Sequence, residues 1–144
     1  MDGERVMTNQ FIPPQFEVLL ALSEPAQDPS WMDPVAAEMP PINFRWCRMP
    51  TGPDVVKRVE RGGLSAALLV TDHAVGEGLS LLRIIRSIDR HLPCWFITPI
   101  ASRQILEAAL ALRVTSVMTY PVEVTELTLG LRKALCFPAQ GNVE

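Results

Sequence analysis

Short apolar runs alternate with amphipathic segments along most of the 144-residue chain. An apolar run that no polar residue interrupts is typical of a strand buried on both faces of a parallel sheet. The run at residues 42–47 begins with an alternation of apolar and polar residues, and this pattern also predicts a strand. The five expected strands are 16–22, 42–47, 64–71, 94–97 and 114–119.

The segments between these runs predict helices, because their apolar residues recur at helical spacing. Gly62-Gly63 is a helix-ending signal, and Ser102 is placed to cap the start of another helix. In the first connection, repeated prolines exclude a long helix. They leave a short one that begins at Pro34, with Asp33 as its cap. The five expected helices are 34–39, 54–61, 78–89, 102–113 and 125–136.

Strands that alternate with helices predict an α/β fold, in which helices cover both faces of a parallel sheet and the crossovers are right-handed. In such folds the functional crevice lies at the carboxyl ends of the strands, where the strand order switches. We therefore expect the residues that follow the strands to meet at one edge of the sheet.

Proline is unevenly distributed, since nine of the 13 prolines fall within the first 53 residues. This imbalance predicts an atypical first crossover with a short or displaced helix. Residues 1–15 show no sustained period and are interpreted as a flexible arm. Residues 16–137 are interpreted as one domain and residues 138–144 as a tail.

Composition and charge argue against several classes of protein. With 48% hydrophobic and 20% charged residues, the chain is typical of a folded globular protein. A net charge of -3 without a basic cluster argues against nucleic-acid binding. Cys47, Cys94 and Cys136 are too widely spaced for a disulfide framework or a zinc site. Because neither a signal peptide nor a membrane span is evident, we expect a cytoplasmic protein with no membrane contact.

The polar residues that follow the strands carry a family resemblance. After the first, third, fourth and fifth strands come Glu24-Pro25, Asp72, Thr98 and Tyr120-Pro121. Over roughly residues 16–136 this arrangement resembles the CheY-like receiver domain of two-component response regulators. The resemblance implies a flavodoxin-like three-layer sandwich with a five-stranded parallel sheet. It also implies that Asp72 is the phospho-acceptor candidate, Thr98 the switch hydroxyl and Pro121 the proline of a cis Lys-Pro pair.

Three positions depart from the receiver pattern. Leu22 and Ser23 replace the acidic pair, and Tyr120 replaces the lysine. Phosphoryl transfer to a carboxylate needs a divalent ion that carboxylates hold, and a neutral phenol lacks the charge of lysine. A match shifted by one residue places Ser23 and Glu24 on the acidic pair. Asp72 and Glu24 are then the metal ligands, if a metal binds at all.

Each candidate also has an interpretation without function. Asp72 can cap the turn that follows it, and Thr98 can be an ordinary strand end. Tyr120 can fill the space that the missing lysine and metal leave. The loop after Asp72 lacks the proline of receivers and is shortened, which also favours a degenerate site.

We therefore expect a stand-alone receiver-like signalling module that is not an enzyme, needs no cofactor and acts through protein contacts without normal magnesium-dependent phosphorylation. Its expected partner is a histidine kinase or a downstream regulator, with a homodimer possible through the fourth helix, fifth strand and fifth helix. One alternative is a functional single-domain regulator that a histidine kinase phosphorylates on Asp72 in the presence of magnesium. Another is a small α/β ligand-binding domain or enzyme with its crevice between Ser23, Asp72 and Thr98.

Overall fold

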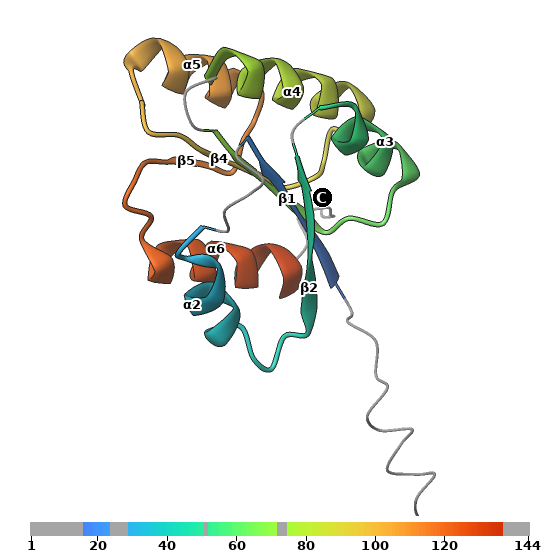
Figure 1. Ribbon diagram of the computed structural model, residues 1–144, viewed down its shortest axis with the longest axis vertical. Coiled ribbons are helices and arrows are strands. Elements are labelled where there is room, and N and C mark those ends of the chain that lie inside the picture. The colour runs from blue at the N-terminus through green and yellow to red at the C-terminus, as the bar shows by residue number, and fades with distance from the viewer. Residues whose placement is uncertain (1–15, 24–28, 51, 72–74, 137–144) are drawn as a thin grey trace, which may run out of the picture.

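The computed structural model describes residues 16–23, 29–50, 52–71 and 75–136, which form five strands and five helices (Figure 1). The elements are, in chain order, β1 (Phe16–Leu22), α2 (Met32–Ala37), β2 (Phe44–Pro50), α3 (Pro53–Arg61), β3 (Ala66–Val70), α4 (Val75–Ile88), β4 (Cys94–Ile97), α5 (Arg103–Ala111), β5 (Ser116–Met118) and α6 (Val124–Cys136).

All five strands are parallel and lie in the order β2-β1-β3-β4-β5. The chain moves outward from β1 to β2, then crosses back over β1 to reach β3. This reversal is the switch point of a flavodoxin-like sheet, and it lies between β1 and β3. The α/β class, the number of strands and their parallel pairing confirm the fold predicted from the sequence.

Two helical layers enclose the sheet, with α2 and α6 on one face and α3, α4 and α5 on the other (Figure 1). Because successive side chains of a strand point to opposite faces, β1 contributes to both cores. Leu20 and Leu22 pack in the α2–α6 layer, whereas Leu19 and Ala21 pack in the α3–α4–α5 layer. All five residues of β3 are buried, as the uninterrupted apolar run predicts.

The short first helix is confirmed, because α2 has only 6 residues, but its predicted cap is wrong. The N-cap is Trp31, with no side-chain hydrogen bond, and Asp33 lies inside the first turn. Trp31 and Met32 are buried against the sheet, so core packing places the helix start two residues before Pro34.

Several further boundaries differ from the prediction: β3 covers Ala66–Val70, β5 covers Ser116–Met118, and α5 ends at Ala111. The differences are largest in β2 and α4. The N–H of Ile42 donates to the carbonyl of Met39, so Ile42 belongs to a turn, and β2 instead continues to Pro50 alongside the full length of β1. Helix α4 begins at Val75 rather than Gly78. Its first turn has exposed residues, which no apolar spacing could indicate.

Two predicted helix boundaries are confirmed. The hydroxyl of Ser102 accepts a hydrogen bond from the N–H of Ile105 at 3.3 Å, and Gly62 ends α3. The predicted arm at 1–15 and tail at 138–144 lie outside the described residues. Among the described helices, none combines the length and apolar character that crossing a bilayer requires.

Candidate functional site at the carboxyl edge of the sheet

The resemblance to receivers places the acidic pair at Leu22 and Ser23; Leu22 is the last residue of β1, and Ser23 follows it. Leu22 is only 3% exposed and packs its aliphatic side chain in the α2–α6 core. The backbone N–H of Ser23 donates to the carbonyl of Val70 at 3.1 Å, which continues the pairing of β1 with β3. The two residues predicted to hold a metal, if one binds, are Glu24 and Asp72, and both lie outside the described residues.

Thr71 is the residue immediately before Asp72, and three contacts hold it in place. Its backbone N–H and its hydroxyl both donate to the carbonyl of Ile97, at 2.8 and 3.2 Å. Its methyl group lies so close to Gly78 of α4 that a side chain at Gly78 would overlap it. The exit of β3 is therefore tightly packed between β4 and the first turns of α4.

Thr98, the predicted switch hydroxyl, is fully buried at the end of β4. Its hydroxyl donates to the carbonyl of Ile100 at 3.1 Å and accepts from the N–H of Ile100 at 3.2 Å. Both contacts lie within the turn that leads to α5. The arrangement matches the interpretation of Thr98 as a strand end, because the side chain stabilises its own turn.

Tyr120 crosses the edge of the sheet from the end of β5. Its peptide bond to Pro121 is cis, as the resemblance implies. The ring remains 44% exposed, while the hydroxyl donates to the carbonyl of Thr71 at 3.1 Å. The side chain thus spans β4 and ties the exit of β5 to that of β3. The resemblance to receivers predicts that Tyr120 stands in place of a lysine. The sequence does not indicate the hydrogen bond to Thr71, because the two residues are 49 positions apart.

The groups with shifted pKa values lie at the opposite, amino-terminal edge of the sheet. Burial opposes ionisation of Glu17 at the start of β1, but hydrogen bonds from Arg58 and Arg45 outweigh it and hold the pKa of Glu17 below 4.5. Burial raises the pKa of the Cys94 thiol, at the start of β4, to about 11. Among the described residues, no three His, Cys, Asp or Glu side chains gather closely enough to hold a metal ion.

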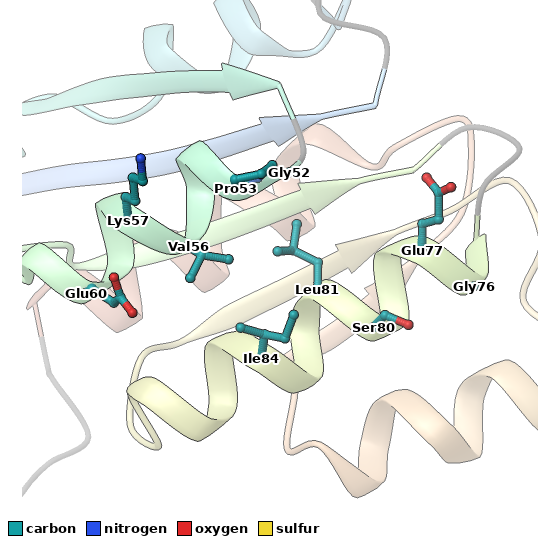
Figure 2. A pocket seen from close by; sticks show the side chains of 10 residues that line it. All are labelled: Gly52, Pro53, Val56, Lys57, Glu60, Gly76, Glu77, Ser80, Leu81 and Ile84. Carbon is teal, nitrogen blue, oxygen red and sulfur yellow. The ribbon is translucent and has the colours of Figure 1, made fainter.

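A separate groove of about 760 Å³ runs between α3 and α4 (Figure 2). Val56 of α3 meets Leu81 and Ile84 of α4 between the two helices (Figure 2). The sequence pattern does not lead us to expect this groove. The feature that could indicate it is that α4 has more apolar residues than its buried face holds: Ile84 lies beside the buried residues of α4 and is 44% exposed.

Large apolar side chains are also exposed near α5 and the exit of β5. Ile100 is 53% exposed in the turn before α5, and Leu110, within α5, is 58% exposed. Tyr120 follows β5, so all three belong to the part of the molecule for which the resemblance implies protein contacts.

Comparison with known proteins gives relatives in structure rather than in sequence. No family model and no curated protein matches the chain. A response regulator from Thermotoga maritima has a TM-score of 0.68 at 11% identity, over 85% of this chain and 98% of that chain. The receiver domain of a sensor histidine kinase from Pseudomonas aeruginosa, solved with magnesium in its active-site cleft, has a TM-score of 0.65 at 21% identity, over 84% and 98%. A protein assigned to pilus assembly in Burkholderia thailandensis has a TM-score of 0.61 at 22% identity, again over 84% and 98%.

The strand order and the two helical layers define a doubly wound α/β protein of the flavodoxin-like class. Within that class, the chain has the fold of CheY-like receiver domains, as the similar structures establish. At these sequence identities the likeness establishes the fold alone.

Proposed function

We propose that the chain is a receiver-like signalling module that acts through protein contacts, without normal magnesium-dependent phosphorylation. The observation that carries the proposal is the hydrogen bond from the Tyr120 hydroxyl to the Thr71 carbonyl. In a phosphorylated receiver, a lysine at the Tyr120 position would bring a positive charge toward the phosphoryl oxygens. Here the same position holds a neutral group that is already bound to the backbone.

The neighbouring hydroxyls support this proposal. The Thr71 hydroxyl donates to Ile97, and the Thr98 hydroxyl donates within its own turn, so both have internal partners. The side chain of Leu22, at the end of β1, contains only carbon and packs in the α2–α6 core. A phosphoryl group at this edge would therefore have to displace hydrogen bonds that already exist, and it would lack the first-strand carboxylate that helps to hold magnesium.

A phosphorylation assay tests the proposal. The purified chain is incubated with acetyl phosphate and magnesium, and separately with beryllofluoride and magnesium, and its mass and amide NMR spectrum are recorded. We expect the mass to remain unchanged and the resonances around residue 72 to stay in place. An Asp72→Asn variant is the control. Stoichiometric modification that this variant loses would overturn the proposal and establish the phosphorylated regulator, with Asp72 and Glu24 as magnesium ligands.

The surface that makes the protein contact is part of the same proposal. Ile100, Leu110 and Tyr120 expose apolar groups on α5 and at the exit of β5. In a homodimer with a twofold axis, each copy of the chain contributes these same residues to the interface. We expect a homodimer through this face, and a histidine kinase or a downstream regulator would compete for it.

Light scattering coupled to size-exclusion chromatography tests this surface. We expect the wild-type chain to elute as a dimer and the Ile100→Glu, Leu110→Glu double variant as a monomer, because a buried glutamate pair would lose its hydration. Ile84→Glu on α4, in the same helical layer but in the groove between α3 and α4, is the matched control and should leave the dimer intact. A wild-type monomer at every concentration, or a dimer that only Ile84→Glu disrupts, would refute the assignment.

A further inference from the structure

The groove between α3 and α4 has an apolar floor and charged margins (Figure 2). Its volume of about 760 Å³ lies in the range of about 300–1,000 Å³ that binding pockets occupy. Glu60 and Glu77 stand on α3 and α4 against a single cation, Lys57, so the margin carries a net negative charge. In Figure 2 Lys57 points away from α4. An apolar segment would fit the floor of this groove.

The chain itself supplies such a segment next to the groove. The Glu17 carboxylate, in the second residue of β1, accepts a hydrogen bond from the Arg58 guanidinium at 2.6 Å. Arg58 is a buried residue of α3, and it also donates to the carbonyl of Gly62 at 2.7 Å. The start of β1 is therefore fixed beside the end of α3. Residues 1–15 enter the domain at this point.

The sequence before β1 is complementary to the groove in its apolar residues. Residues 5–12 read Arg-Val-Met-Thr-Asn-Gln-Phe-Ile and contain two apolar pairs, whereas Asp2 and Glu4 before them outnumber the single cation Arg5, so charge does not contribute to the fit. Phe11-Ile12 is the pair nearer to β1. Phe11 precedes Phe16 by five residues, which span up to about 16 Å when extended. The whole of α3, with 9 residues, is about 14 Å long, so Phe11 is within reach of the groove.

We propose that residues 5–12 of the chain dock in the α3–α4 groove, with Phe11 and Ile12 against Val56, Leu81 and Ile84. This contact is independent of the proposed function at the carboxyl edge. It covers the exposed side of Ile84.

Disulfide trapping tests the contact in the full chain. Cys47 and Cys136 are replaced by serine, and the fully buried Cys94 is kept. Gln10→Cys, beside the docking pair, is then combined with Ser80→Cys, which lines the groove. We expect this variant to oxidise to an intramolecular disulfide, detected on a non-reducing gel and by mass spectrometry.

The matched control combines Gln10→Cys with Leu129→Cys. Leu129 is 62% exposed on α6, in the other helical layer, so random encounters can still reach it. We expect little intramolecular disulfide in this control. Equal trapping at both positions would overturn the proposal. Trapping as linked dimers alone would also overturn it and would make a second copy the occupant of the groove.

Hydrogen exchange provides a second readout that needs no cysteine. Changing Phe11 and Ile12 together to serine should release the segment and increase amide exchange in 80–84 of α4. The Thr8→Ser, Asn9→Ser variant alters the same segment without removing apolar groups and should exchange like the wild type. Identical exchange in wild type and in the Phe11, Ile12 variant would refute the docking.

Discussion

At the scale of single residues, the structure adds to the sequence-based expectation mainly the hydrogen-bond partners of the hydroxyl groups at the carboxyl edge of the sheet. The sequence predicts that Thr98 follows a strand and, through the resemblance to receivers, that Tyr120 stands in place of a lysine. It cannot show that Tyr120 donates to Thr71 or that Thr98 closes its own turn, because hydroxyl partners depend on the three-dimensional approach of backbone carbonyls. Residue identities predict the position of the site, and only the structure gives its hydrogen bonds.

Gly78 offers a sharp test of how closely α4 approaches the exit of β3. A Cβ there would overlap the Thr71 methyl and stand 3.0 Å from the Phe96 ring. We expect Gly78→Ala to lower the free energy of unfolding by about 1–3 kcal/mol, the usual cost of overpacking a core. Urea denaturation measures the change.

The control for this variant lies two residues earlier on the same helix. A Cβ at Gly76 would meet nothing within 4 Å. Gly76→Ala should therefore cause no loss of stability and can add up to about 1 kcal/mol, because alanine has less freedom to lose in a helix. If the two variants lose stability equally, the tight contact at Thr71 does not exist.

At the scale of elements, sequence patterns predict the presence of helices better than their ends. Periodic apolar residues and the cap at Ser102 locate α5 closely. The start of α2 is set instead by burial of Trp31 and Met32, and β2 extends to Pro50 because β1 offers a partner along its whole length. Tertiary packing decides these boundaries, so local propensity could not reveal them.

Arg86 connects the end of α4 to the turn that follows α5. This buried residue of α4 donates to the carbonyls of Asp89, Leu112 and Arg113, at 3.0, 2.8 and 3.1 Å. We expect Arg86→Met to lower the free energy of unfolding by at least about 2 kcal/mol, because three carbonyls lose a charged donor.

Arg83 on the same helix is the matched control, since it is exposed. Arg83→Met should change the free energy of unfolding by no more than about 0.5 kcal/mol. Thermal or urea unfolding of the two variants side by side measures the difference. Equal stabilities would show that Arg86 does not hold the ends of α4 and α5 together.

At the scale of the whole molecule, the fold follows from the sequence more completely than the site does. Alternating strands and helices predict an α/β fold with a parallel sheet, and the resemblance to receivers adds the flavodoxin-like architecture. The residues that follow the strands predict that the candidate site lies at the carboxyl edge. The α3–α4 groove escapes such an analysis, because Val56 and Ile84 have the same apolar character as the core residues beside them. Only the packing of two helices shows which apolar residues remain uncovered.

The Glu17 network makes global stability depend on pH at the amino edge of the sheet. Because Arg58 and Arg45 hold the pKa of Glu17 below 4.5 in the folded state, its ionised form stabilises the fold. That contribution is present above pH 4.5 and is lost as the pH falls through the lower, folded-state value. We expect wild type to be more stable than Glu17→Gln at neutral pH.

The difference in the free energy of unfolding between wild type and Glu17→Gln should shrink as the pH falls below 4.5. Urea denaturation across this range measures it, and Glu107→Gln, at an exposed ion pair on α5, is the control with little expected pH effect. A stability difference between wild type and Glu17→Gln that is constant with pH would contradict the assigned ion pair.

The placement of the tryptophans determines what optical experiments on this protein can detect. Trp31 and Trp95 are buried in the α2–α6 layer, and Trp46 packs against that layer with its ring 6.3 Å from Trp31. These are all the tryptophans of the chain. Intrinsic tryptophan fluorescence therefore reports on the α2–α6 layer, whereas circular dichroism records the helices on both faces of the sheet. Coincidence of the two unfolding curves would show that both layers melt as one cooperative unit, and their separation would reveal a half-folded state.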